Sequence, residues 1–123
     1  MIAMARTRAR TAKRWQDADE MRWAVRHWAA RIDVKVPLVH FRAMRTKWAS
    51  MSHRRLTLDT GLLKLPKDLG EFVVVHELVH VLVRNHGRVF KSFMYAYMPD
   101  WEERDRRLRM RWKPAPPCDV AAR

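Results

Sequence analysis

The feature that most constrains the fold is an apolar run that begins at Pro66 and continues to about Arg84. Its residues are apolar on nearly every side of a helical projection, which is typical of a helix that is buried all round. Proline suits the first turn, where its missing N–H costs nothing. The run also holds His76, Glu77 and His80, and polar groups are costly to bury unless something satisfies them. The sequence therefore predicts a central helix with a specific use for these three side chains.

The spacing of these polar residues is that of a zinc site. His76 and His80 are about one helical turn apart, so both imidazoles project from one face and can hold a single zinc ion. Glu77 lies about 100° round the helix from His76, where it can take a proton from a zinc-bound water. Six histidines and five glutamates in 123 residues give roughly 0.01 chance occurrences of this HExxH pattern. We therefore predict bound Zn²⁺ with Glu77 as the catalytic base, in preference to a helix with ordinary core histidines.

A catalytic zinc ion generally takes three protein ligands and keeps one position for water. His86 is the favoured third ligand, although an unbroken helix would place it about 9 Å further along the axis and on another face. The helix is therefore expected to end near Arg84. Asn85 and Gly87 both tolerate the left-handed conformation that terminates helices, so a turn is expected there.

A last helix is predicted over residues 100–113, where acids occupy the first half and bases the second, in agreement with the helix dipole. Glu102 and Glu103 on this helix are the alternative third ligands. Each has an arginine four residues later, so surface ion pairs with Arg106 and Arg107 explain the two glutamates more simply. Three apolar residues are expected to dock the helix on the core: Trp101, Leu108 and Trp112.

Two further helices are predicted on either side of the central one. Asp17 can cap a helix that continues to Ile32, because its apolar residues recur at helical spacing. Another helix is expected from Arg88 to Met98, closed before Pro99. The residues between Ile32 and Pro66, which separate the first helix from the central one, remain for strands.

A small sheet is predicted in that region, which makes the fold class α+β. Residues 33–44 alternate in the manner of a strand, and Pro37 favours a place at the sheet edge. Leu56 and Leu58 share one face of a second short strand. The stretch 46–55 has no sustained period, so a loop around its tryptophan is expected there.

The net charge of +13 suggests a polyanionic partner such as DNA or RNA. The alternative explanation is a basic surface that is simply solvated. Residues 1–14 carry five basic and no acidic residues, so a flexible basic arm is expected. Residues 114–123 have the proline content of a disordered tail. The folded domain is thus expected to span residues 15–113.

Cys118 is the only cysteine, which excludes a disulfide framework and a cysteine-type zinc site. A single cysteine is typical of a reducing compartment, and a cytoplasmic location is expected. No apolar run is long enough to span a bilayer, and the start of the chain lacks the apolar segment of a secretory signal. We therefore expect a soluble protein without membrane contacts.

Two stretches resemble the YgjP-like zinc metallopeptidase domain, a relative of the SprT-like and WLM metalloproteases. They are KWASMSHRRLTLD and LPKDLGEFVVVHELVHVLVRNHGRVFKSFMYAYMPDW, and the resemblance covers roughly residues 40–110. It implies a compact, zincin-like single domain, in which the HExxH helix packs with other helices and a small sheet. Where the family usually has Trp-Gly-Ser-Cys-Ser, this chain has WASMS at residues 48–52.

The resemblance also implies roles for particular residues. HExxH-x5-H ligation maps onto three histidines and a catalytic glutamate: His76, His80, His86 and Glu77. In zincins an extended substrate pairs with the sheet edge beside the metal, and the strand over residues 54–59 is the expected counterpart by analogy. His40 and His53 are expected to be structural or exposed histidines.

Three functions fit these features. The first is a zinc-dependent peptidase acting on protein or peptide. The second is a metal-dependent endoribonuclease of the YbeY type, which also uses an H-x3-H-x5-H triad. The third is a zinc-stabilised nucleic-acid-binding module without catalysis. Glu77 favours the peptidase, because the YbeY type has glycine beside its first histidine and a structural site has no use for the carboxylate.

The basic charge agrees with the peptidase, because SprT-like and WLM proteases act on proteins attached to or bound on DNA. Residues 6–14 and the last helix could hold nucleic acid without sequence preference while the zinc site cuts protein. The substrate, the oligomeric state and any regulation of the site do not follow from the sequence.

Overall fold

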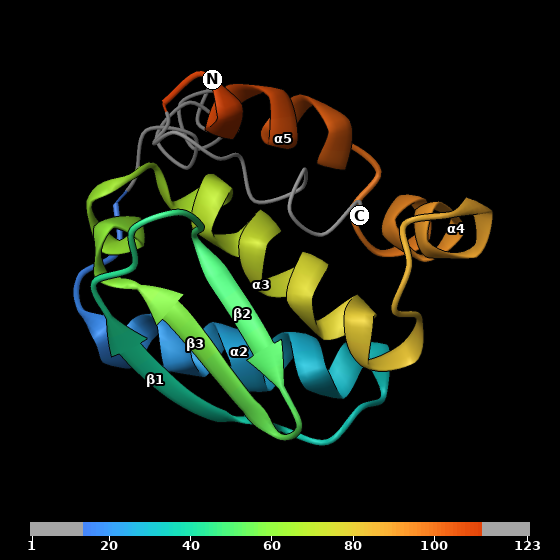
Figure 1. Cartoon of the computed structure of the whole chain (residues 1–123), viewed down its shortest axis with the longest axis horizontal. Coiled ribbons are helices and arrows are strands. Elements are labelled where there is room, and N and C mark those ends of the chain that lie inside the picture. The colour runs from blue at the N-terminus through green and yellow to red at the C-terminus, as the bar shows by residue number, and fades with distance from the viewer. Residues whose placement is uncertain (1–13, 112–123) are drawn as a thin grey trace, which may run out of the picture.

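The computed structural model describes residues 14–111, which form four α-helices, a three-stranded sheet and a 3-10 helix (Figure 1). The elements are α2 (Ala18–Ile32), β1 (Leu38–Arg42), β2 (Ala49–Ser52), β3 (Arg55–Asp59), η1 (Thr60–Lys64), α3 (Lys67–Leu82), α4 (Arg88–Tyr97) and α5 (Trp101–Arg109). The α+β fold class is confirmed. The expected basic arm and tail lie outside the described residues, except for Arg14, which forms an isolated bridge with Pro66.

Helix α3 runs through the middle of the molecule, as its uniformly apolar sequence predicts (Figure 1). It packs against α2, α4, α5, β2 and η1. Its buried residues follow one another without interruption from Phe72 to Val79, so the two polar residues His76 and Glu77 lie inside the core. The burial of a carboxylate and an imidazole side by side is the structural basis of the site described below.

The end of α3 differs from the expectation, because neither Asn85 nor Gly87 adopts a left-handed conformation. The helix ends at Leu82, and Val83 is extended at φ −140° and ψ 119°. A β-branched residue favours that conformation. The chain then turns through the Asn85 side chain, whose Oδ1 accepts a hydrogen bond from the Gly87 N–H at 3.1 Å.

Helix α2 follows its sequence signals closely. Asp17 caps it, with Oδ1 accepting a hydrogen bond from the Glu20 N–H at 2.9 Å. The Glu20 side chain in turn accepts from the Gln16 N–H at 2.7 Å. Six apolar residues of the helix face the core, whereas Trp23 is exposed: Met21, Ala24, Val25, Trp28, Ala29 and Ile32 are buried. This helix packs along α3 and supports it from one side.

The sheet has the order β1-β3-β2, with β1 parallel and β2 antiparallel to β3. The expectation of a loop over residues 46–55 is wrong, because strand β2 lies within this stretch. The strand predicted over 33–44 is shorter and starts at Leu38, directly after Pro37, but it does form a sheet edge. Because β3 pairs on both sides, the expectation that residues 54–59 form the edge beside the metal is also wrong. That edge is β2, which contacts α3.

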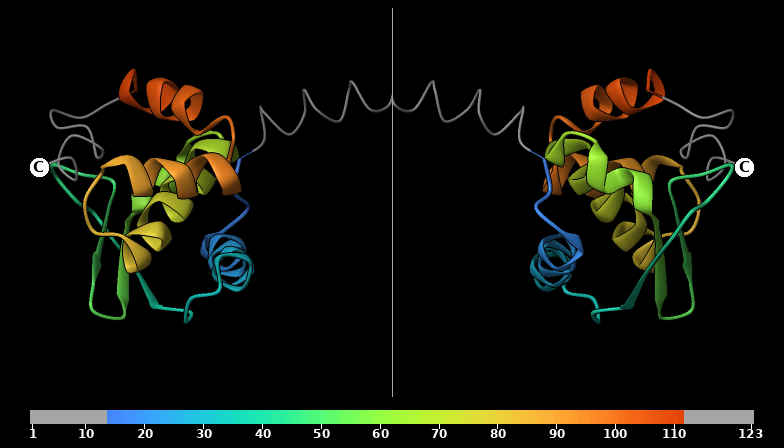
Figure 2. Two further views of the ribbon diagram at one scale, coloured as in Figure 1. Left: turned by 90° about the vertical axis from the view of Figure 1, so that its right-hand side faces the viewer. Right: turned by 90° about the vertical axis from the view of Figure 1, so that its left-hand side faces the viewer.

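One face of the sheet packs on helices and the other is open. Leu56 and Leu58 of β3 are fully buried. Helices α2 and α3 lie together on one side of the sheet (Figure 2). His40 and Arg42 are exposed and Thr57 is half-buried on the opposite face. No helix within residues 14–111 covers that outer face (Figure 2).

Helix α5 docks through Trp101 and Leu108, as expected, whereas Trp112 lies outside the described residues. The expected ion pairs of Glu102 and Glu103 with arginines four residues later are absent from the ion pairs within residues 14–111. Arg107 binds Asp68 and Arg104 binds Glu71, both on α3. Two other pairs are local, with a spacing of four residues: Arg104–Asp100 and Arg109–Asp105. A contact to α3 thus replaces the local pair that was expected for Arg107. None of the described helices is long and apolar enough to cross a bilayer.

Candidate metal centre

The structure brings together the three histidines that were predicted as ligands. His76 and His80 project from α3, and His86 projects from the turn between α3 and α4. Each offers one ligand atom, and these atoms all lie within 4.8 Å of one another. Glu102 and Glu103, the alternative ligands, are exposed on α5 and are not part of this cluster.

The hydrogen bond of His80 leaves one ring nitrogen ready for a metal. Its Nδ1 lies 3.0 Å from the carbonyl oxygen of Val83, and because a carbonyl only accepts, Nδ1 carries the proton. The lone pair is then on Nε2, which is buried and has no hydrogen-bond partner within the described part of the chain. Burial, and next the charge of His76, lower the pKa of His80, so the ring is neutral at neutral pH. A neutral imidazole held by a backbone carbonyl is the usual state of a metal ligand.

His76 and His86 present their nitrogens at the separation that a metal requires. The Nδ1 atom of His76 lies 3.2 Å from Glu77 Oε2, and because a carboxylate only accepts, Nδ1 is the donor. The nitrogen left to face a metal is Nε2. That Nε2 lies 3.2 Å from Nε2 of His86. Two nitrogens bound tetrahedrally at about 2.0–2.1 Å from a zinc ion would be about 3.3 Å apart. The donor set and its spacing therefore fit a zinc ion.

Glu77 is the buried carboxylate of the site, with 7% of its surface exposed. Burial by itself would raise its pKa, but the hydrogen bond from His76 and nearby positive charge, which includes Lys47, outweigh burial and lower it. Glu77 is therefore ionised at neutral pH. An ionised carboxylate beside the histidine cluster can accept a proton.

A cleft of about 570 Å³ opens beside Glu77 and His80. Its other walls come from β2, from the β2–β3 turn and from the end of α3: Met51, Ser52, His53, Val81 and Arg84. The cleft thus lies between the edge strand and the helix that carries the site. A peptide that enters it meets the carboxylate and one histidine of the cluster.

Several residues of this cleft do not stand out in the sequence. His53 was expected to be a structural or exposed histidine, and it lies exposed on the β2–β3 turn with φ 55° while also lining the cleft. Arg84 lines the opposite wall. His40 is exposed on β1, the far edge of the sheet. The only sequence signal for the β2 wall is residues 48–52, which correspond to a loop in the family that the chain resembles.

A second cavity of about 210 Å³ lies on the other side of the cluster, where His76 and His86 form part of its wall. Asp105 of α5 lines the same cavity. Its Oδ2 accepts a hydrogen bond from Arg109 Nε at 3.0 Å, whereas its Oδ1 is buried and has no hydrogen-bond partner within the described residues. A half-satisfied carboxylate thus shares a small cavity with two histidines of the cluster.

Comparison with known proteins identifies the family of the chain and solved structures with a similar fold. The family model described as "YgjP-like, metallopeptidase domain" matches residues 3–111, a longer stretch than the one that carries the resemblance in the sequence. No curated protein matches the chain significantly. Two crystal structures of metallopeptidase zymogens are similar in fold. Abylysin of Pyrococcus abyssi is 21% identical, with a TM-score of 0.64 over 71% of this chain and 90% of that one. Jannalysin of Methanocaldococcus jannaschii is 19% identical, with a TM-score of 0.66 over 73% and 94%.

Proposed function

The chain belongs to the YgjP-like metallopeptidase domain family, and from this premise we propose that it is a zinc-dependent peptidase with HExxH-x5-H ligation. The observation that carries the proposal is the cluster of three imidazoles beside an ionised, buried glutamate at the wall of a cleft. We assign the metal to the Nε2 atoms of His76, His80 and His86. Three protein ligands are typical of catalytic zinc, because a fourth position stays free for water.

Glu77 is proposed as the general base. Zinc, when bound, would lower the pKa of water to about 7 and polarise the carbonyl of the substrate. The Glu77 carboxylate accepts the proton of the attacking water and then donates it to the amine that leaves. Arg84 lines the same cleft and brings positive charge toward the place where the carbonyl oxygen becomes negative. The cleft walls hold the peptide and exclude bulk water from these groups.

The edge of β2 is the proposed binding surface for the substrate backbone. One side of β2 pairs with β3, and its other edge faces the cleft and α3. An extended peptide can add to such an edge through main-chain hydrogen bonds. This assignment replaces the strand over residues 54–59, which is the centre of the sheet.

Proteins associated with DNA are the proposed substrate class. The support is the resemblance to SprT-like and WLM proteases, together with the net charge of +13. The last helix contributes less to this argument than its arginine content suggests, because Arg104, Arg107 and Arg109 are held in ion pairs. Residues 6–13 lie outside the described part.

Chelation tests the proposed activity. We expect the purified full chain to cleave an unfolded protein, to lose that activity after dialysis against a chelator, and to regain it when zinc is restored. The measurement is the appearance of fragments on a gel, with intact mass spectrometry of the products. Cleavage that persists in the metal-free protein would contradict the proposal. Cleavage of RNA without cleavage of protein would support the endoribonuclease alternative instead.

Asp105 lines the same small cavity as His86, and we propose that its Oδ1, which accepts no hydrogen bond within the described residues, accepts the second N–H of His86 once the metal is bound. A carboxylate in that role commonly changes metal affinity by about 10–100-fold. Asp105→Ala should therefore weaken zinc binding by that order, and Asp105→Asn should weaken it less, because the amide oxygen can still accept. Competition with a chromophoric chelator measures the affinity without any assay of activity. Arg109→Gln is the matched control, since it breaks the Asp105 ion pair but keeps the carboxylate. An equal loss in the control would assign the effect to packing.

A further inference from the structure

The chain segment that forms the sheet is strongly basic, and its one acidic residue, Asp59 at the end of β3, is buried. Residues 34–58 contain six lysines or arginines and not one aspartate or glutamate. The six are Lys35, Arg42, Arg45, Lys47, Arg54 and Arg55. The acids that form ion pairs within the described residues lie instead on or next to the helices α2, α3 and α5. The charges of the fold are thus segregated, with the positive side at the sheet.

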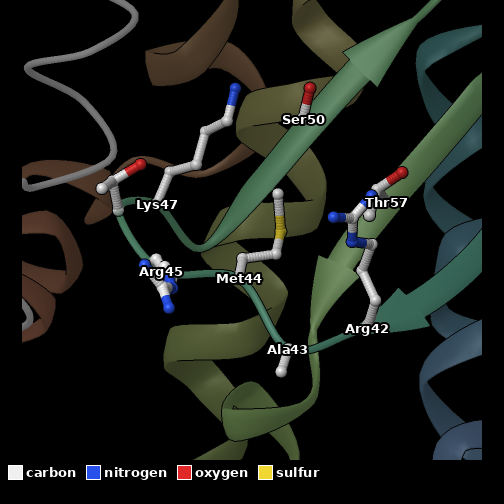
Figure 3. Close-up of a pocket in the computed structure, with 8 residues that line it drawn as sticks. Arg42, Ala43, Met44, Arg45, Lys47, Ser50 and Thr57 are labelled. Atoms are coloured by element: carbon white, nitrogen blue, oxygen red, sulfur yellow. The ribbon is translucent and has the colours of Figure 1, made fainter.

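A pocket of about 490 Å³ lies within this positive region (Figure 3). The chain between β1 and β2 forms one side of it, and the outer face of the sheet forms the other. Three cations line it, together with three hydroxyls: Arg42, Arg45, Lys47, Thr46, Ser50 and Thr57. Ser50 and Thr57 are paired across β2 and β3, so their hydroxyls lie on the same face. No acidic residue lines the pocket.

The loop that carries these cations is held in place by a buried carboxylate. Asp59 is 3% exposed, and its Oδ1 accepts a hydrogen bond from the Met44 N–H at 2.7 Å. Its Oδ2 accepts from the Gly61 N–H at 3.2 Å, and its own N–H donates to Trp48 O at 2.8 Å. A Cβ at Gly61 would approach Oδ2 to 2.7 Å, so glycine is required for this contact. Hydrogen bonds of Asp59 therefore fix the loop between β1 and β2, which carries Arg45 and Lys47.

The charges of this pocket are available to a ligand. Arg42 and Arg45 form no ion pair within residues 14–111, in contrast to Arg104, Arg107 and Arg109 of α5. The basic pocket and the metal cleft share β2 as a common wall, because Ser50 lines the pocket while Met51 and Ser52 line the cleft. A group bound in the pocket would lie next to the proposed active site.

We propose that this pocket binds a phosphate of a nucleic-acid backbone. Arginine guanidinium groups and hydroxyls are typical partners of phosphate oxygens, and backbone contacts of this kind are made with DNA and RNA alike. Two further cations, Arg54 and Arg55, lie at the β2–β3 turn, at the opposite end of the strands from the pocket. Positive charges spread along a sheet suit a chain of regularly spaced phosphates better than a single carboxylate. The inference rests on the proposed function, because it names the surface of the protein that would bind the nucleic-acid partner. Binding at this surface can be measured without any peptidase activity.

The test compares two double variants of the full chain that lose the same charge. Arg42→Ala with Arg45→Ala removes two cations of the pocket. Arg26→Ala with Arg106→Ala is the control, because both residues are exposed on helices and neither is in an ion pair of the described residues. Fluorescence anisotropy with a labelled single-stranded oligonucleotide, as DNA and as RNA, gives the affinity at several salt concentrations.

For the pocket variant we expect an affinity loss on the order of tenfold per removed contact and a log–log salt slope reduced by about two. The control should stay within about threefold of the wild type. Arg45→Glu alone should also weaken binding, which keeps the test valid if the double variant folds poorly. Equal losses in pocket and control variants, no binding by the wild type, or displacement of the oligonucleotide by polyglutamate at equal charge concentration would each overturn the proposal. Peptide cleavage is not measured here, so failure of the peptidase assignment would leave these results unaffected.

Discussion

Glu77→Gln is expected to lower the rate of protein cleavage by about 10²–10⁴, the usual contribution of a general base. Glutamine has nearly the shape of glutamate but cannot accept a proton from the attacking water. Its amide oxygen can still accept the hydrogen bond from His76 Nδ1, which the carboxylate receives at 3.2 Å. The fold and the zinc content should therefore stay as in the wild type. Initial rates on an unfolded protein and on a DNA-bound protein provide the measurement.

Glu71→Gln is the matched control, because it makes the same change six residues earlier on α3. Glu71 accepts hydrogen bonds from Trp28 and Arg104 and does not line the cleft. Its replacement should leave the rate within a fewfold of the wild type. If Glu77→Gln cuts protein as fast as the wild type while it keeps its zinc, the proposed role of Glu77 is wrong.

His86→Ala is expected to lower the zinc affinity strongly, because it removes a direct ligand. Loss of a residue that only hydrogen-bonds a ligand lowers the affinity roughly 10–100-fold, and the loss for His86→Ala should be larger. The variant should also lose the rise in melting temperature that zinc gives the wild type, since a ligand that binds only the folded state stabilises it. Metal analysis after gel filtration and thermal melts with and without zinc provide the two measurements. Activity should fall with the metal.

Glu102→Ala and Glu103→Ala serve as the controls for this prediction. Both glutamates are exposed on α5, outside the histidine cluster, and both should keep full zinc occupancy. The third ligand would have to be reassigned if either variant lost zinc while His86→Ala retained it.

The helices could be predicted from the sequence because their signals are local. The Asp17 cap and the apolar spacing that follows specify α2, and the unbroken apolar run specifies α3. β2 could not be predicted in this way. Its four residues, ASMS, lack a periodic apolar pattern, and they form a strand only because β3 offers hydrogen bonds to them. Propensity is a weak guide where pairing decides the structure.

Part of the candidate site could likewise be predicted from local sequence signals, and part depends on tertiary packing. His76, Glu77 and His80 lie within five residues of one helix, so their geometry follows from helical periodicity alone. The return of His86 requires a chain reversal, which was expected from left-handed residues but is made by the Asn85 side chain. The opposite wall of the cleft comes from residues 51–53, more than twenty positions earlier in the chain. Such a contact depends on tertiary packing and leaves no local signal.

The arginines of α5 show how tertiary contacts override local pairing. A spacing of four residues predicts Glu103–Arg107, whereas Arg107 binds Asp68 on α3 at 2.7 Å. Nothing in the local sequence indicates that α5 lies along α3. Three arginines of the last helix are thus held in ion pairs, whereas Arg42 and Arg45 at the sheet form none within residues 14–111.

Anomalous diffraction from crystals of the purified protein, recorded on both sides of the zinc absorption edge, is the most direct test of the proposed metal centre. The account predicts one zinc peak per chain, about 2.0–2.1 Å from the Nε2 atoms of His76, His80 and His86. The fourth position should hold a solvent molecule on the cleft side, within hydrogen-bond reach of Glu77. A peak bound by Glu102 or Glu103, or a fourth protein ligand that closes the site, would contradict it.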